Sequence, residues 1–235
     1  MAKRSKQYRK AAEAFDRNAL YSIDEAVEIV KKISFAKFDE AVEAHFCLGI
    51  DPRKSDQTVR SSVVLPHGTG KTPNVIVITK ADKFAAAEAA GADAVGAEDI
   101  IAKIKGGWSD FDIAVASPDM MGLVGKELGR ILGPRMPNPR AGTVTPDPAK
   151  AVAELKSGKL QFRNDKNGII HTPIGRVKFE SDQIKQNFQV LFDAIVKSRP
   201  TSAKGTYIKS IYLAPTMGPA VRVDPQKVAV AAGNR

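Results

Sequence analysis

The chain has 235 residues, 43% of them hydrophobic, and carries 36 lysines and arginines against 26 aspartates and glutamates, a formal net charge of +10. This hydrophobic fraction excludes disorder of the whole chain, and no apolar run reaches the roughly 20 residues that span a bilayer. The basic N-terminus leads into no apolar core of the kind that a secretory signal needs. A single cysteine, Cys47, excludes an internal disulfide and a multi-cysteine metal cluster. We therefore expect a cytoplasmic protein with no part in the membrane.

The N-terminal flank, residues 1–67, predicts two helices followed by two strands. The first helix is expected over residues 6–16, and the second after Ser22, whose spacing to Glu25 is that of a capping box. Residues 40–50 alternate strictly between two faces, with Glu43, His45 and Cys47 opposite the apolar set. That alternation is typical of an antiparallel strand with one buried and one wet face. The other strand is expected over residues 61–65.

The middle of the chain, residues 68–158, alternates short apolar runs with helical patterns. Strands are expected over residues 75–78, 94–95 and 113–116, and helices over 82–90, 98–104, 118–132 and 148–156, the last two capped by Ser117 and Asp147. This alternation predicts a parallel sheet with helices on both faces. Gly122, Gly125 and Gly129 lie at helical spacing, which favours close packing of that helix over a dinucleotide site.

The C-terminal flank, residues 159–235, predicts an antiparallel hairpin, a long helix and two further strands. Residues 160–163 and 169–172 flank an Asn-Gly turn, the strongest short hairpin signal. The helix is expected over residues 181–197, and the strands over 207–213 and 221–223.

Because both flanks are α+β, the simplest fold is one split domain, an antiparallel sheet with helices formed by residues 1–67 and 159–235. It carries residues 68–158 as an inserted α/β domain with three layers, similar to a Rossmann domain. Gly68, Gly70 and Gly158 stand at the two boundaries and are interpreted as hinge positions.

The net charge belongs to the two flanks alone. They hold 25 basic and 15 acidic side chains, whereas residues 68–158 hold 11 of each. A basic excess predicts attraction to a polyanion, chiefly nucleic acid, and a general solubility charge is the alternative.

The segment Gly-Thr-Gly-Lys-Thr at residues 68–72 resembles the end of a phosphate-binding loop. The first glycine of that motif is replaced by Leu65, and Pro73 with another strand follows where a helix is required. Nucleotide hydrolysis is therefore disfavoured, and a glycine hinge at a domain boundary is the better interpretation.

Histidines and the cysteine are too few and too scattered to predict a reactive site. His45 and Cys47 share a strand face, but two ligands make no zinc site, and His67 and His171 lie in other elements. No residue supplies the orienting partner of a catalytic pair. We expect no enzyme, no metal and no cofactor. The alternative from another class is an α/β enzyme that uses the insert as its ligand domain.

With 6% aromatic residues the chain is a poor base-stacking platform, and it suits a folded RNA recognised through phosphates, shape and 2′-hydroxyls. The candidate contacts are basic, hydroxyl or apolar side chains beside turns, namely Lys37, Phe38, Asp165, Lys166, Ser210, Thr216, Met217 and Gly218. For Phe38 the residues alone favour packing in the core. Gly218, next to Pro219, has turn chemistry as its alternative.

Five segments stand in the order of a known family and at close to its spacing. They are AKFDE at 36–40, LGIDPR at 48–53, LPHGTGK at 65–71, FRNDK at 162–166 and TMGP at 216–219. Together they resemble the bacterial large-subunit ribosomal protein of the lateral stalk, the ribosomal protein L-one family, over the whole chain. The resemblance implies a two-domain protein on the large ribosomal subunit and a monomer off the ribosome.

The resemblance also implies partners and contacts. The split domain would bind a helical region of large-subunit ribosomal RNA, and the insert would reach toward transfer RNA in the exit site and help to release it when deacylated. The protein would also repress its own operon by binding its messenger RNA. All eight candidate residues, Phe38 included, would contact RNA. Residues 133–140 depart from the family pattern by being two residues shorter, which bears on the transfer-RNA side alone.

Overall fold

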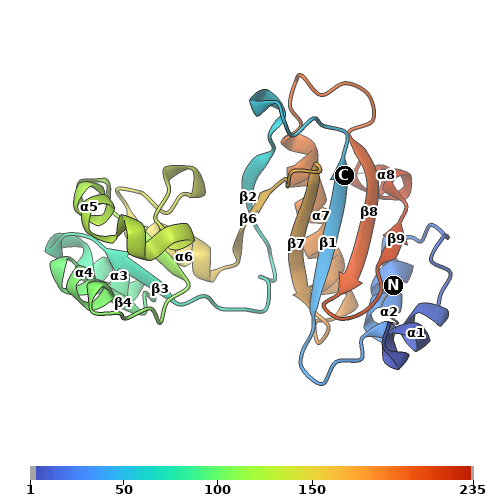
Figure 1. The fold of residues 1–235 in the computed structure, drawn as a ribbon, viewed down its shortest axis with the longest axis horizontal. Coiled ribbons are helices and arrows are strands. Elements are labelled where there is room, and N and C mark those ends of the chain that lie inside the picture. Colours follow the sequence, from blue (N-terminus) through green and yellow to red (C-terminus); the bar gives the residue numbers. More distant parts are fainter. Residues whose placement is uncertain (1–3, 234–235) are drawn as a thin grey trace. The chain divides into compact units, whose positions relative to one another are not determined.

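The computed structural model describes residues 4–233, and the side chains of Arg140 and of residues 230–233 are left out of the description. The chain forms two compact units, each described here by itself (Figure 1). Unit 1 comprises Met1–Gly70 and Leu160–Arg235, and unit 2 comprises Lys71–Lys159. The sequence predicted boundaries after residues 67 and 158. In the structure the units divide three residues and one residue later, after Gly70 and after Lys159.

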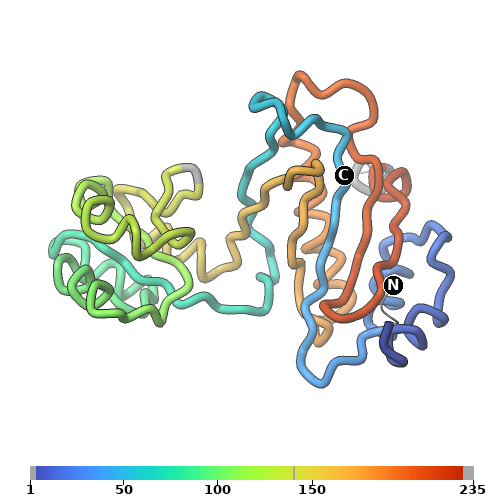
Figure 2. The backbone as a smooth tube through the Cα atoms, viewed as in Figure 1, coloured from blue at the N-terminus to red at the C-terminus, as the bar shows by residue number. Residues whose placement is uncertain are grey.

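Unit 1 is built on a four-stranded antiparallel sheet in the order β7-β1-β8-β9. The strands are β1 (Ala41–Leu48), β7 (Ile169–Arg176), β8 (Ile208–Pro215) and β9 (Val221–Val223). Strands from the two ends of the chain therefore lie side by side, as the blue and red segments of the tube show (Figure 2). Helices α2 (Ile23–Ile33) and α7 (Ser181–Lys197) cover one face of this sheet (Figure 1).

The buried face of β1 holds the apolar set that the alternation predicted. Val42, Ala44, Phe46 and Leu48 are buried, and the Phe46 ring stacks on Phe188 of α7 with 5.7 Å between ring centroids. The other side chains of β1 must then point away from α2 and α7, because successive strand residues face opposite sides. The predicted half-buried strand is confirmed.

The helices of unit 1 begin and end largely where local signals indicate. The capping box before α2 is confirmed: the Ser22 N–H donates to Glu25 Oε2 at 2.8 Å, and the Glu25 N–H donates to Ser22 Oγ at 3.3 Å. Helix α1 (Lys6–Glu13) ends three residues earlier than expected. A terminal helix, α8 (Pro225–Gly233), was not predicted.

The predicted hairpin of residues 160–163 with 169–172 is wrong. Strand β6 (Lys159–Arg163) pairs with β2 (Arg60–Val64) in a separate two-stranded sheet, whereas β7 pairs with β1. The turn itself exists, with Gly168 at φ +76°, and a single bridge joins Asn164 to Ile170. An Asn-Gly signal specifies the turn, but the partner of each strand is chosen by where its side chains are buried.

Strand β8 also departs from simple alternation. Tyr207, Ile211 and Leu213 are buried, but Lys209, which strict alternation would place on the same face, is exposed. The register between β1 and β8 shifts at this point, so that Lys209 is the extra residue of a bulge.

Unit 2 contains a three-stranded parallel sheet in the order β4-β3-β5. Its strands are β3 (Val75–Ile78), β4 (Ala94–Gly96) and β5 (Ile113–Ala116), and its helices are α3 (Phe84–Ala89), α4 (Glu98–Lys105), α5 (Met121–Leu132) and α6 (Pro148–Lys156). Ile76 and Ile78 share a buried cluster with α4 and α5, whereas Val75 and Val77 share one with α3 and α6. Helices therefore cover both faces, and the predicted similarity to a Rossmann domain stays a prediction.

Local expectations within unit 2 have mixed outcomes. Asp147 caps α6 as predicted, its carboxylate accepting from the Lys150 N–H at 3.4 Å. Ser117 occupies the predicted cap position, with Pro118 first in the 3-10 turn Pro118–Met120, but its buried hydroxyl makes no capping hydrogen bond to the described residues.

The close packing predicted for the glycines of α5 is also wrong. Among the described residues, a Cβ atom built on Gly122 or Gly129 would meet nothing within 4 Å, and one on Gly125 would meet only Met136 Cε at 3.9 Å. Helical spacing places the three glycines on one face of α5, but spacing carries no information about what that face contacts.

Candidate nucleic-acid interface

The sheet of unit 1 has a face turned away from α2 and α7, here called the open face. Glu43, His45 and Cys47 of β1 lie on it because their neighbours in the strand are buried on the other side. The register places His45 opposite both His171 of β7 and Tyr212 of β8, and Tyr212 opposite Arg222 of β9. Polar and ionisable side chains thus form a row across all four strands.

Five of the eight predicted contact residues meet at one end of this sheet. Lys37 and Phe38 precede β1, and Thr216, Met217 and Gly218 follow β8. The first residue of β1 is hydrogen-bonded to the second loop: the Ala41 N–H donates to Thr216 Oγ1 at 3.0 Å, and the Thr216 N–H donates to the Ala41 carbonyl at 3.1 Å. Register across antiparallel strands therefore unites segments about 180 residues apart.

Phe38 and Met217 are exposed apolar side chains in these loops, with 56% and 53% of their surfaces accessible. The core packing of Phe38 that the residues alone favoured is therefore wrong. Lys37 and Phe38 also border a surface hollow of about 280 Å³, which Val177 and Lys178 help to line. An apolar side chain beside a lysine, on a loop that is held in place, suits a wedge against an RNA backbone or base.

Glu40 holds both loops in place and was not identified from the sequence. Its side chain is buried, with 2% of its surface exposed. Oε1 accepts from the N–H groups of Phe35 at 2.9 Å and Ala36 at 2.7 Å, and Oε2 accepts from the Met217 N–H at 3.0 Å. A buried carboxylate is stable when such donors surround it. The alternation of residues 40–50 places Glu40 on the side of the apolar set, but nothing in the sequence shows which donors meet its carboxylate.

The other three predicted contacts lie toward the opposite end of the sheet. Asp165 and Lys166 belong to the turn before β7, and Ser210 of β8 lies opposite Cys47. Since β1 has eight residues, the two ends are about 25 Å apart. The structure therefore brings the eight residues together as two groups joined by the open face, and not as one cluster.

Asp165 serves its own turn. Its Oδ1 accepts from the N–H groups of Asn167 and Ile169, both at 2.8 Å. The Ile169 N–H is the main reason that the pKa of the Asp165 carboxyl lies below its usual range, and the Asn167 N–H adds to it. The turn presents Lys166 as an exposed cation beside a hollow of about 400 Å³, which Arg163 also lines.

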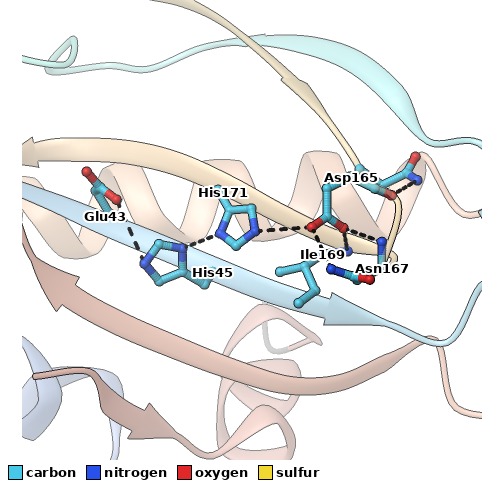
Figure 3. A network of polar contacts seen from close by, with 7 residues as sticks. Glu43, His45, Asp165, Asn167, Ile169 and His171 are labelled. Carbon is cyan, nitrogen blue, oxygen red and sulfur yellow. Dashed lines mark hydrogen bonds and ion pairs between the residues drawn. The ribbon is translucent and has the colours of Figure 1, made fainter. Parts of the chain in front are cut away.

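Two histidines meet on the open face between these groups (Figure 3). Their Nδ1 atoms are 2.8 Å apart, His45 Nε2 is 3.9 Å from Glu43 Oε2, and His171 Nε2 is 3.7 Å from Asp165 Oδ2. Burial and the neighbouring ring of His171 lower the pKa of His45 from its ordinary value. Among the described residues, no group of three or more His, Cys, Asp or Glu is arranged to hold a metal ion.

All three residues predicted as hinges adopt left-handed backbone angles. Gly68 has φ +62°, Gly70 +76° and Gly158 +101°, a region that favours glycine. A Cβ atom on Gly70 would also lie 2.5 Å from Arg176 Cγ. The glycines are thus required by local geometry, and a hinge role stays a prediction.

Asn187 of α7 anchors the segment before the first boundary. Its buried side chain accepts from the His67 N–H at 3.1 Å and donates to the Gly68 carbonyl at 2.8 Å, both within unit 1. On the other side of the boundary, Lys71 Nζ pairs with Asp112 Oδ1 at 2.9 Å within unit 2. At this first boundary the chain is therefore hydrogen-bonded to unit 1 at Gly68 and paired within unit 2 at Lys71.

Nearly all of the net positive charge lies in unit 1. Unit 1 contains 24 basic and 15 acidic residues, and unit 2 contains 12 and 11. A basic α+β unit with exposed apolar side chains and lysines around an open sheet face defines a protein of the nucleic-acid-binding class.

A model of the ribosomal protein L1p/L10e family matches residues 30–219, which include all five segments that carry the resemblance. The chain belongs to this family, as the sequence predicted. It is accordingly a ribosomal protein, part of a ribonucleoprotein, that binds RNA of the large subunit, and its family is one of structural RNA-binding proteins and not of enzymes. No helix within the described residues is both long and apolar enough to cross a membrane.

Proposed function

We propose that unit 1 binds a helical region of large-subunit ribosomal RNA through the open face and the loops at its two ends. The contacts are those named from the sequence: Lys37, Phe38, Asp165, Lys166, Ser210, Thr216, Met217 and Gly218. The observation that carries the proposal is the pair of exposed apolar side chains, Phe38 and Met217, on loops that the buried Glu40 carboxylate ties together. Loops fixed in advance lose little conformational entropy when RNA binds.

The two ends of the sheet have different tasks in this proposal. Phe38 and Met217 pack against the ribose and base surface of the RNA, while Lys37 meets a phosphate. At the other end Lys166 and Arg163 meet phosphates, and Asp165 acts by holding its turn. An RNA helix lying along the open face would span the distance between the two groups.

Unit 2 is assigned the transfer-RNA side of this function. In our proposal it contacts transfer RNA in the exit site and helps to release it when deacylated, with Gly68, Gly70 and Gly158 as hinge residues. Its near balance of charge fits a transient contact better than a permanent one. The shortened segment 133–140, which contains a 3-10 turn at Gly133–Arg135, lies on this unit.

Repression of its own operon would use the same surface of unit 1. A messenger RNA that mimics the ribosomal site would compete with ribosomal RNA for the open face. Free protein off the ribosome would act as a monomer, because one copy of unit 1 carries both groups of contacts.

A protein reduced to unit 1 tests the central proposal. Gly70 is joined to Leu160 by a short Gly/Ser linker, and its affinity for bacterial large-subunit ribosomal RNA is compared with that of the full chain. The core of unit 1 is formed by its own residues, so we expect a folded protein with an affinity within about tenfold of the full chain. Release of exit-site transfer RNA should suffer much more. A folded unit 1 that no longer binds ribosomal RNA would refute the assignment of the site to this unit.

A further inference from the structure

Two histidines, His45 and His171, lie in the row of side chains across the open face, and neither is among the eight proposed RNA contacts. The row runs across the four strands through His171 of β7, His45 of β1, Tyr212 of β8 and Arg222 of β9, each directly opposite the next. His171 has 51% of its side chain exposed and His45 has 22%, so a ligand on the face can reach the pair. The pair lies in the middle of β1 and β7, between the Lys37 and Lys166 ends of the sheet, and Figure 3 shows the two rings facing each other.

The contact between the two rings limits the charge that they can carry together. At 2.8 Å, one Nδ1 donates its proton and the other accepts it. Adding a proton to both rings would set two N–H donors against each other, which breaks the contact. With the contact kept, the pair is therefore either neutral or singly positive.

The charges around the pair decide whether its protonation favours or disfavours the binding of a phosphate. Among the described residues, the ionisable groups that face the pair or lie in its row are Glu43 and Cys47 of β1, Asp165 of the turn, Tyr212 of β8 and Arg222 of β9. With a neutral pair, the two carboxylates outnumber Arg222, which disfavours a phosphate. One proton on the pair restores the balance and leaves the Nε2–H of the exposed His171 ring as a donor, because its Nδ1–H is donated to His45.

We propose that the His45–His171 pair is a phosphate-binding site within the RNA-binding face, and that it binds the RNA backbone in the singly protonated state. This inference rests on the proposed function of unit 1. It makes the affinity for ribosomal RNA rise as the pH falls through the range in which histidine takes up a proton. The burial of His45, which lowers its pKa, leaves that ring as the acceptor within the protonated pair.

The size of the effect follows from one proton and one phosphate. A single linked proton changes affinity by at most about tenfold per pH unit, so we expect binding about five- to tenfold tighter at about pH 6 than at about pH 8. One additional phosphate contact steepens the slope of log affinity against log salt by about 0.7–0.9. A purely structural role of the pair would leave that slope unchanged.

The experiment measures the affinity of the full chain for large-subunit ribosomal RNA at both pH values and over a range of salt. The variants are His171→Gln alone, which leaves β1 intact, and His45→Gln with His171→Gln. The matched control is His67→Gln, because His67 contacts Gln186 on α7 and takes no part in the row. Melting at neutral pH checks that each variant is folded.

We expect the pH effect and the steeper salt slope in the wild type and in His67→Gln, and neither in the two pair variants. Affinity that is independent of pH, weakens in acid, or keeps its pH effect without the pair would overturn the inference and leave the proposed function standing, because RNA still binds. Absence of RNA binding at either pH would overturn the proposed function itself.

Discussion

Removing the carboxylate of Glu40 should disconnect the two loops that carry most of the proposed RNA contacts. Glu40→Ala takes the acceptor away from three backbone N–H groups, those of Phe35, Ala36 and Met217. A hydrogen bond contributes about 1 kcal/mol net when water replaces the lost partner. Three such bonds give a loss of about 3 kcal/mol in the free energy of unfolding.

Glu40→Gln is the more specific variant, because it keeps the size of the side chain and changes only the carboxylate into a carboxamide. A carboxamide has one acceptor oxygen and one donor NH₂, so it can serve Phe35 and Ala36 or Met217, but not both. We expect a loss of about 1–2 kcal/mol in stability. The two loops are then no longer held together by one side chain. The affinity for ribosomal RNA should fall by about tenfold or more, which corresponds to about 1.4 kcal/mol.

The assay combines urea unfolding with an RNA titration at constant salt. Glu28→Gln is the control, since it removes the same charge from an exposed position of α2 and leaves both loops alone. We expect the control to match the wild type in both measurements. If Glu40→Gln unfolds and binds RNA like the wild type, Glu40 does not position the loops and this reasoning is wrong.

Three other expectations concern the loops, the boundary and the charge. Met217→Asp should weaken RNA binding with unchanged melting, whereas Gly218→Val should also destabilise the loop, because a Cβ there would lie 2.5 Å from Pro215 Cγ. Gly70→Ala should lower unfolding free energy by about 2 kcal/mol, measured by urea unfolding, since it combines a left-handed φ with a contact against Arg176. RNA affinity of the full chain should fall steeply with salt, with a log–log slope of about 0.7–0.9 per phosphate contact; a flat salt titration would contradict the electrostatic argument.

Much of the fold was predictable from patterns that act over a few residues. The Ser22–Glu25 box and the Asp147 cap each join groups three residues apart, so the sequence alone locates these helix ends. Alternation along residues 41–48 likewise determines which side of β1 is buried. Most of the candidate contacts came from residue type beside a turn and from the family resemblance, and Phe38 shows that residue type alone misjudged burial.

The remaining features depend on partners far apart in the chain. Strand β6 pairs with β2 and not with β7, although a good turn joins β6 to β7, because strand pairing follows the burial of side chains over the whole unit. Glu40 meets Met217 across 177 residues, and His45 meets His171 across 126. No local pattern reports such contacts, since they exist only once the register of β1 with β7 and β8 is set. The sequence by itself determined most of the elements and their charge. The tertiary structure decided which side chains share a surface, because only folding brings those strands together.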